Sequence, residues 1–106
     1  MLNMIRIEIT RINGNINHLS IKGHANSDEY GKDLVCAAVS AVITGGLNSL
    51  ENSKSFGIIF EEGNVEVSSL SGVSKNDYHT LEVILTQLRT IEEDNKKYVQ
   101  IIEKGN

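Results

Sequence analysis

The sequence predicts an α+β fold in which one sheet packs against two helices, and three kinds of pattern lead to it. Short segments alternate apolar and polar residues, which is typical of half-buried strands. Glycine-containing turns divide these segments into two hairpins. Two longer segments repeat apolar residues at helical spacing. The expected order is β-β-α-β-β-α-β, a mixed α/β layer arrangement in a single domain covering residues 1–106.

The first hairpin is expected near the N-terminus. The segment from Met4 to Arg11 places an apolar residue at every second position, and the segment from Ile16 to Gly23 reads as its partner strand. Between them, Asn13-Gly14-Asn15 favours a tight turn, because Asn and Gly tolerate the positive φ that such turns require. The residues expected to face the core are Ile5, Ile7, Ile9, Leu19 and Ile21.

The first helix is expected from about Asp33 to Leu50. Its sequence, DLVCAAVSAVITGGLNSL, is apolar on nearly every side, which indicates a helix packed on more than one face. A second hairpin follows, combining Phe56–Glu61 with Asn64–Leu70 around the turn Glu62-Gly63.

The second helix is expected from about Asn76 to Lys97, with Ser74 and Asp77 at capping-box spacing. A last strand is expected from Tyr98 to Glu103. The apolar stripe of the helix consists of Tyr78, Leu81, Ile84, Leu85, Leu88 and Ile91. The helix positions expected to be solvated are Glu82, Gln87, Arg89 and Glu93.

Composition excludes several classes of function. The formal net charge is −4 and the ten basic residues are scattered, which argues against direct binding of nucleic acid. A single cysteine excludes an intramolecular disulfide framework and a zinc ribbon. The most hydrophobic run, Leu34 to Leu47, is shorter than the ~20 residues needed to span a bilayer. No signal peptide is apparent at the N-terminus, so we expect a cytoplasmic protein with a reduced cysteine.

The stretch from Gly23 to Ala41 holds the candidate chemistry, because it contains His24 and the only cysteine, Cys36. An unperturbed thiol is only ~3% thiolate at pH 7, so a nucleophilic cysteine needs activation. With Asp33 as the N-cap, Cys36 would occupy the first helical turn, near unpaired N–H groups that favour a thiolate and can form an oxyanion hole. His24 would then either stabilise the thiolate as an imidazolium or, as a neutral imidazole, take up the thiol proton.

The residues alone leave alternatives open. Asp33 either caps the helix or orients His24 as a third catalytic group. Cys36 within LVCAAV also fits an inert core position, and His24 fits a solvated loop residue. A metal site combining His24 with Asp28 and Glu29 lacks a diagnostic spacing. The other histidines, His18 and His79, lie on faces expected to be exposed and receive no role.

The segments GHA and GKDLVCAAVSA resemble the ribosomal-processing cysteine protease family, Prp. Members of this family are similar to one another in having a Gly-His pair, an aspartate, a cysteine three residues later and a serine four beyond that. The resemblance covers essentially the whole chain, including the acidic helix that contains TIEED. The matching positions in this sequence are Gly23, His24, Asp33, Cys36 and Ser40.

The resemblance implies a cysteine endopeptidase that removes the N-terminal extension of large-subunit ribosomal protein twenty-seven. It implies Cys36 as the nucleophile and His24 as its base, with Gly23, Asp33 and Ser40 in support. It also implies a homodimer, a loop near the site that orders on substrate binding, and no cofactor or metal. The alternative is a non-catalytic ribosome-assembly or interaction module in which Cys36 only packs in the core.

Overall fold

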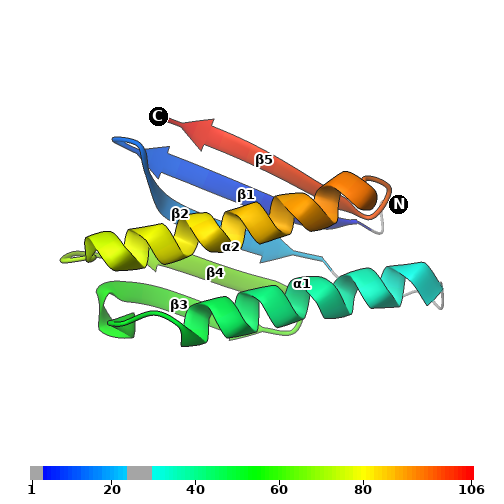
Figure 1. The fold of residues 1–106 in the computed structure, drawn as a ribbon, viewed down its shortest axis with the longest axis horizontal. Coiled ribbons are helices and arrows are strands. Elements are labelled where there is room, and N and C mark those ends of the chain that lie inside the picture. The colour runs from blue at the N-terminus through cyan, green and yellow to red at the C-terminus, as the bar shows by residue number, and fades with distance from the viewer. Residues whose placement is uncertain (1–3, 24–29) are drawn as a thin grey trace.

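The computed structural model describes residues 4–23 and 30–106, and within them five strands form one mixed sheet in the order β3-β4-β2-β1-β5. Two helices lie together on one face of this sheet (Figure 1). The element order is β-β-α-β-β-α-β, so the predicted fold class is confirmed. The elements are β1 (Ile5–Ile12), β2 (Asn15–Lys22), α1 (Tyr30–Asn48), β3 (Phe56–Glu61), β4 (Asn64–Ser69), α2 (Lys75–Asp94) and β5 (Val99–Gly105), with a short 3₁₀ helix at Ser53–Ser55.

The first hairpin forms because its turn residues accept left-handed backbone conformations. Asn13 and Gly14 have φ of 53° and 82°, the pattern of a type I′ turn between antiparallel β1 and β2. The register shifts between Thr10 and Arg11, which leaves an extra residue in β2. This bulge lets Ile16 face the core together with Leu19, although strict alternation would direct them to opposite faces.

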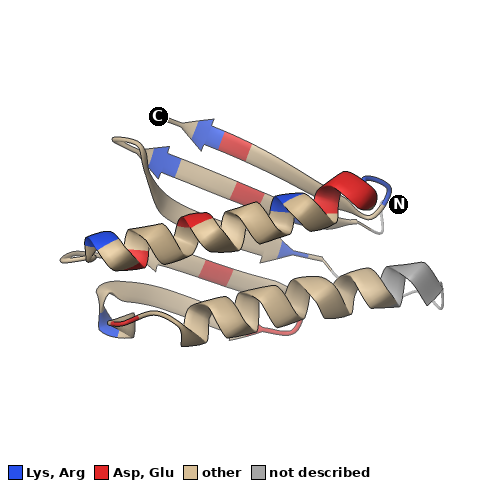
Figure 2. Ribbon diagram, in the orientation of Figure 1, with Lys and Arg blue, Asp and Glu red and all other residues tan. Residues whose placement is uncertain are grey.

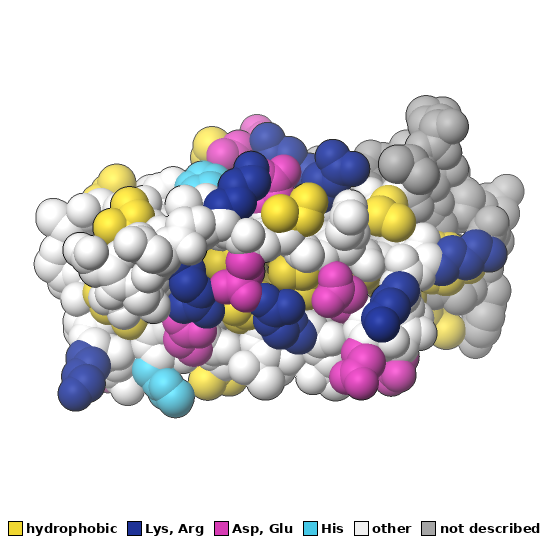
Figure 3. All heavy atoms as spheres, turned by 90° about the horizontal axis from the view of Figure 1, so that it is seen from above, with side chains coloured by type: hydrophobic (Ala, Val, Ile, Leu, Met, Phe, Trp, Pro, Cys, Tyr) yellow, Lys and Arg dark blue, Asp and Glu magenta, His cyan; other side chains and the backbone are white. Residues whose placement is uncertain are grey.

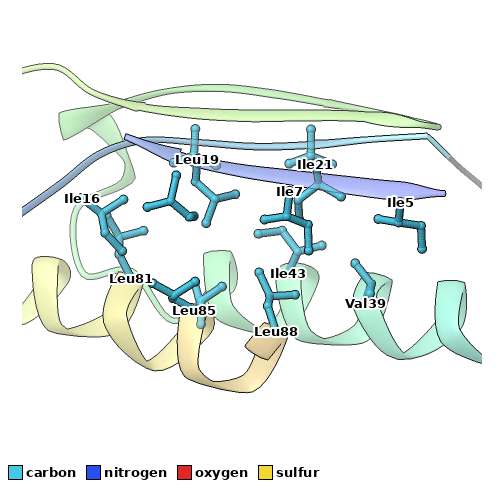
Figure 4. Close-up of a cluster of buried hydrophobic side chains, with 14 of the residues drawn as sticks. Ile5, Ile7, Ile16, Leu19, Ile21, Val39, Ile43, Leu81, Leu85 and Leu88 are labelled. Carbon is cyan, nitrogen blue, oxygen red and sulfur yellow. The ribbon is translucent and has the colours of Figure 1, made fainter. Parts of the chain in front are cut away.

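The core lies between the sheet and the two helices. Ile7, Ile9 and Leu19 are fully buried from the sheet side, and α2 contributes Leu81, Ile84, Leu85 and Leu88. Figure 4 shows Val39 and Ile43 pointing from α1 towards Ile5 and Ile7 of β1. The alternation expected for β1 is therefore confirmed, and the stripe expected on the second helix is confirmed at its buried positions.

Helix α1 differs from the prediction at both ends, since it begins at Tyr30 rather than near Asp33 and ends at Asn48 rather than Leu50. Its described side chains include no charged residue, so the helix is tan throughout beyond its first turn in Figure 2. No helix within residues 4–23 and 30–106 has the length and apolar character needed to cross a bilayer.

The start of α2 is fixed by a cap and by a buried carboxylate. Ser74 is the N-cap, and its hydroxyl accepts a hydrogen bond from the Asp77 backbone N–H at 3.0 Å, as the capping-box spacing predicted. The Asp77 side chain is fully buried and accepts the backbone N–H groups of Glu51 and Asn52 at 2.8 and 3.0 Å. Asp77 therefore ties the chain after α1 to the first turn of α2.

On the side of the molecule that carries β5, basic and acidic side chains lie interspersed, with hydrophobic side chains between them (Figure 3). Arg11 forms ion pairs with Glu82 of α2 at 2.6 Å and with Glu103 of β5 at 2.7 Å. Arg89 also pairs with Glu103. Glu82, which was expected to be solvated, keeps a side chain that is 39% exposed, and its carboxylate accepts two hydrogen bonds from the Arg11 guanidinium.

Candidate active site

Two of the site residues expected from the sequence lie on one face of α1. Cys36 and Ser40 are separated by one helical turn, so their side chains share a face. Cys36 is partly buried and packs against the edge of the core, whereas Ser40 is exposed. The thiol is therefore neither sealed in the interior nor on open surface.

Both residues line a groove of about 510 Å³ at the end of the sheet. Its floor is apolar, because Ile5, Ile21 and Val65 contribute from the sheet and Val39 and Ile43 from α1. The size and lining suit a peptide side chain or a small apolar ligand. The remaining lining residues are Gly23, Phe60, Glu61, Glu62, Gly63 and Asn64.

Gly23 fixes the chain at one edge of the groove. Its φ is +95°, and a Cβ added there would lie 2.5 Å from the carbonyl oxygen of Met4, so only glycine fits without a backbone shift. Its N–H donates a 3.1 Å hydrogen bond to the carbonyl oxygen of Gly63 in the β3–β4 turn. The end of β2, the start of β1 and the β3–β4 turn are thus held together immediately before His24.

His24 lies outside the described residues, as do Asp28 and Glu29. For Asp33 the structure describes the backbone, which is helical, but not the side chain. The interpretation of Asp33 as the N-cap was wrong, because α1 already begins at Tyr30. The other role expected for Asp33, orienting His24, stays a prediction.

The earlier start of α1 also corrects the expected place of Cys36. The cysteine lies in the second helical turn, so its backbone N–H falls inside the helix and not among the unpaired groups of the first turn. The N–H groups without a partner inside α1 come before Asp33, one turn or more before Cys36. In the described part of the chain, the helix-start N–H groups therefore do not lie next to Cys36, as the expected oxyanion hole required.

The sequence did not reveal the opposite wall of the groove, which comes from the β3–β4 hairpin. Phe60 is 51% exposed although it is a large apolar residue. Figure 2 shows the acidic turn between β3 and β4 lying near α1, and residues of both line the groove. The hairpin itself was predicted, but no local signal states which helix it will face.

The two histidines that received no role lie away from this groove lining. His18 sits on the sheet face opposite the helices, where its Nδ1 is 2.8 Å from the Ser68 hydroxyl and its Nε2 is 3.6 Å from Glu66. His79 is exposed on α2.

Comparison with known proteins gives consistent matches over nearly the whole chain. The family model of the cysteine protease Prp matches residues 4–100. A ribosomal processing cysteine protease Prp from Mycoplasma genitalium is 36% identical over 105 residues, covering 96% of this chain and 98% of the relative. The Staphylococcus aureus protein of the same name is 30% identical over 103 residues, covering 92% and 97%.

A crystal structure of Prp from S. aureus in complex with a covalently linked product peptide superimposes with a TM-score of 0.84. It is 30% identical in sequence and covers 95% of this chain and 100% of that chain. The family model, the sequence relatives and the shared architecture agree, and the chain belongs to the family of the cysteine protease Prp.

Proposed function

We propose that this protein is a cysteine endopeptidase that removes the N-terminal extension of large-subunit ribosomal protein twenty-seven. The observation that carries the proposal is the position of Cys36 in the lining of an open, apolar groove, in a chain that belongs to a cysteine protease family. The partly buried thiol can meet a peptide carbonyl that lies in the groove, while the core beneath keeps the helix in place.

In this mechanism the Cys36 sulfur attacks the scissile carbonyl carbon and His24 accepts the thiol proton. The tetrahedral intermediate collapses, the C–N bond breaks and His24 returns the proton to the leaving amine. Water, deprotonated by His24, then hydrolyses the thioester and releases the new carboxyl end with the free thiol. The reaction requires no cofactor or metal. The covalently linked product peptide of the S. aureus protein supports a covalent route.

Three further residues act in support of this dyad. Gly23 holds the strand end that leads into His24, through its positive φ and its bond to Gly63. Asp33 precedes Cys36 by one helical turn, and in this proposal it orients His24 as a third group. Ser40 follows Cys36 by one turn, and its exposed hydroxyl can bond the peptide backbone in the groove.

The substrate is a basic ribosomal protein, and the net charge of −4 on this chain favours its approach. Exposed charges are screened beyond ~10 Å at 0.1 M salt, so they supply little discrimination between sequences. The apolar floor of the groove selects between peptide sequences, because apolar side chains that enter it are removed from water. We propose that the chain acts as a single domain over residues 1–106, as a cytoplasmic homodimer that binds no nucleic acid directly.

The rival function is a non-catalytic ribosome-assembly or interaction module. The contact of Cys36 with the core is the observation in its favour. Alkylation separates the two functions, because a packing cysteine resists iodoacetamide in the folded protein, whereas a nucleophile in an open groove reacts. His24→Ala should slow alkylation at pH 7 if the dyad exists, and an equal rate in both proteins would contradict it.

The decisive experiment incubates the purified protein with the extended ribosomal protein and follows the loss of the extension by mass spectrometry. Matched peptides then show whether substrate selectivity comes from apolar contacts or from charge. Replacing aromatic residues before the cut with alanine should reduce kcat/KM far more than doubling the ionic strength does. A larger effect of salt would show that the apolar groove does not select the substrate.

A further inference from the structure

The helices cover the start of the edge strand β3 but not its end, which lies next to the groove. Phe56, Ile58 and Phe60 of β3 lie on the sheet face that the helices cover. They pair with Ser69, Val67 and Val65 of β4, in that order. Their exposure rises from 6% at Phe56 through 39% at Ile58 to 51% at Phe60. Their partners Val65 and Val67 on β4 are buried, at 7% and 1%. The uncovered apolar surface is therefore local to the end of β3.

Phe60 is the residue where this uncovered surface joins the groove. It lines the groove together with Cys36, whereas Ile58 does not. Its partner Val65 belongs to the groove floor, so the ring extends the apolar floor out to the sheet edge. A half-exposed phenylalanine makes only a small contribution to folding, since the apolar area it removes from water is limited. The exposed part of the ring is open to contact with a molecule bound in the groove.

We infer that Phe60 is a specificity-determining residue that binds an apolar side chain of the peptide cleaved at Cys36. This inference rests on the proposed function. The occupant is an extended peptide segment, because the groove is continuous from the thiol to the ring and its volume of about 510 Å³ fits individual side chains. An aromatic side chain is preferred over an aliphatic one, because ring pairs gain stabilisation beyond the area they bury.

Strand β3 provides a matched control in the next residue. Ile59 is 46% exposed, close to the value for Phe60, but it pairs with Glu66 on the sheet face opposite the helices. Alanine at either position removes an exposed apolar side chain from the same strand. A difference in substrate selection between Phe60→Ala and Ile59→Ala therefore reports on the groove and not on the strand.

The test measures kcat/KM for a peptide of the extension and for copies in which each apolar residue in turn is alanine. Phe60→Ala should lower kcat/KM for the parent peptide roughly ten- to fiftyfold, mainly through KM, and Phe60→Leu by less. For one alanine-substituted peptide the loss should shrink to within about threefold, which identifies the side chain that contacts the ring. Ile58→Ala should have a smaller effect than Phe60→Ala, and Ile59→Ala almost none.

Binding of the same peptides to Cys36→Ala, with and without Phe60→Ala, gives a readout that does not need hydrolysis. Thermal unfolding checks that Phe60→Ala stays within about 8 °C of wild type. If wild type cleaves the parent peptide but Phe60→Ala and Ile59→Ala behave alike, the inference is wrong and the proposed function stands. If wild type cleaves no peptide and Cys36→Ala binds none, both are wrong.

Discussion

Gly23→Ala is the substitution whose effect follows most directly from the geometry of the site. Alanine at φ +95° costs about 1–2 kcal/mol in backbone strain. Its methyl group would also lie 2.5 Å from the Met4 carbonyl oxygen, a backbone atom that cannot rotate away. Relieving such a contact by a backbone shift costs roughly a further 1–3 kcal/mol. The total, about 2–5 kcal/mol, is a large part of the stability of a small domain.

Gly14→Ala separates the two contributions. Gly14 also has a positive φ, +82°, but a Cβ there would meet nothing within 4 Å. Urea unfolding should therefore show a loss of about 1–2 kcal/mol for Gly14→Ala and a larger loss for Gly23→Ala. The difference between the two variants measures the cost of the contact with Met4.

The two glycine variants should differ more in kcat/KM than in the free energy of unfolding. A backbone shift at Gly23 moves the adjacent His24, and a displacement of about 1 Å in a catalytic group can reduce the rate 100-fold. Under conditions where both variants are folded, Gly14→Ala should retain wild-type kcat/KM and Gly23→Ala should lose most of it. Equal stability of the two variants, or wild-type kcat/KM in Gly23→Ala, would refute the reasoning.

Three further outcomes are expected. Cys36→Ala should abolish cleavage and change the free energy of unfolding by only about 1 kcal/mol, since the thiol is partly exposed; processing at the wild-type rate would exclude Cys36 as nucleophile. Asp77→Ala should destabilise the protein by roughly 2–5 kcal/mol in urea unfolding, because two backbone N–H groups lose their buried acceptor; a loss below 1 kcal/mol would contradict that role. The hydrogen bond from Arg11 lowers the pKa of Glu103 below its usual 4.5, so this pair stabilises the fold above that pH and the contribution is lost as pH falls through the lower folded value. The stability difference between wild type and Arg11→Met should therefore be larger at pH 7 than at pH 2, and a difference that grows on acidification would contradict the assignment.

Local patterns sufficed for most of the fold. The alternation of Ile5, Ile7 and Ile9 determined which face of β1 is buried, because residues two apart in a strand share a face. The Asn13-Gly14 turn determined the first hairpin, and Ser74 determined the start of α2. The short motif around Cys36 was also enough to indicate the family, which the comparisons confirm.

Only the tertiary structure decided which residues surround Cys36 and form the walls of its groove. The sequence placed the start of the first helix at Asp33, but α1 extends back to Tyr30, and this moves Cys36 from the first turn to the second. Asp77 looked like a capping residue and proved to be the buried acceptor for two distant N–H groups. The groove wall at Phe60 depends on β3 lying at the sheet edge, beyond the helix cover. Periodicity reports which residues share a face, but which segments meet across the core depends on pairing between residues far apart in the chain, and no local pattern records that pairing.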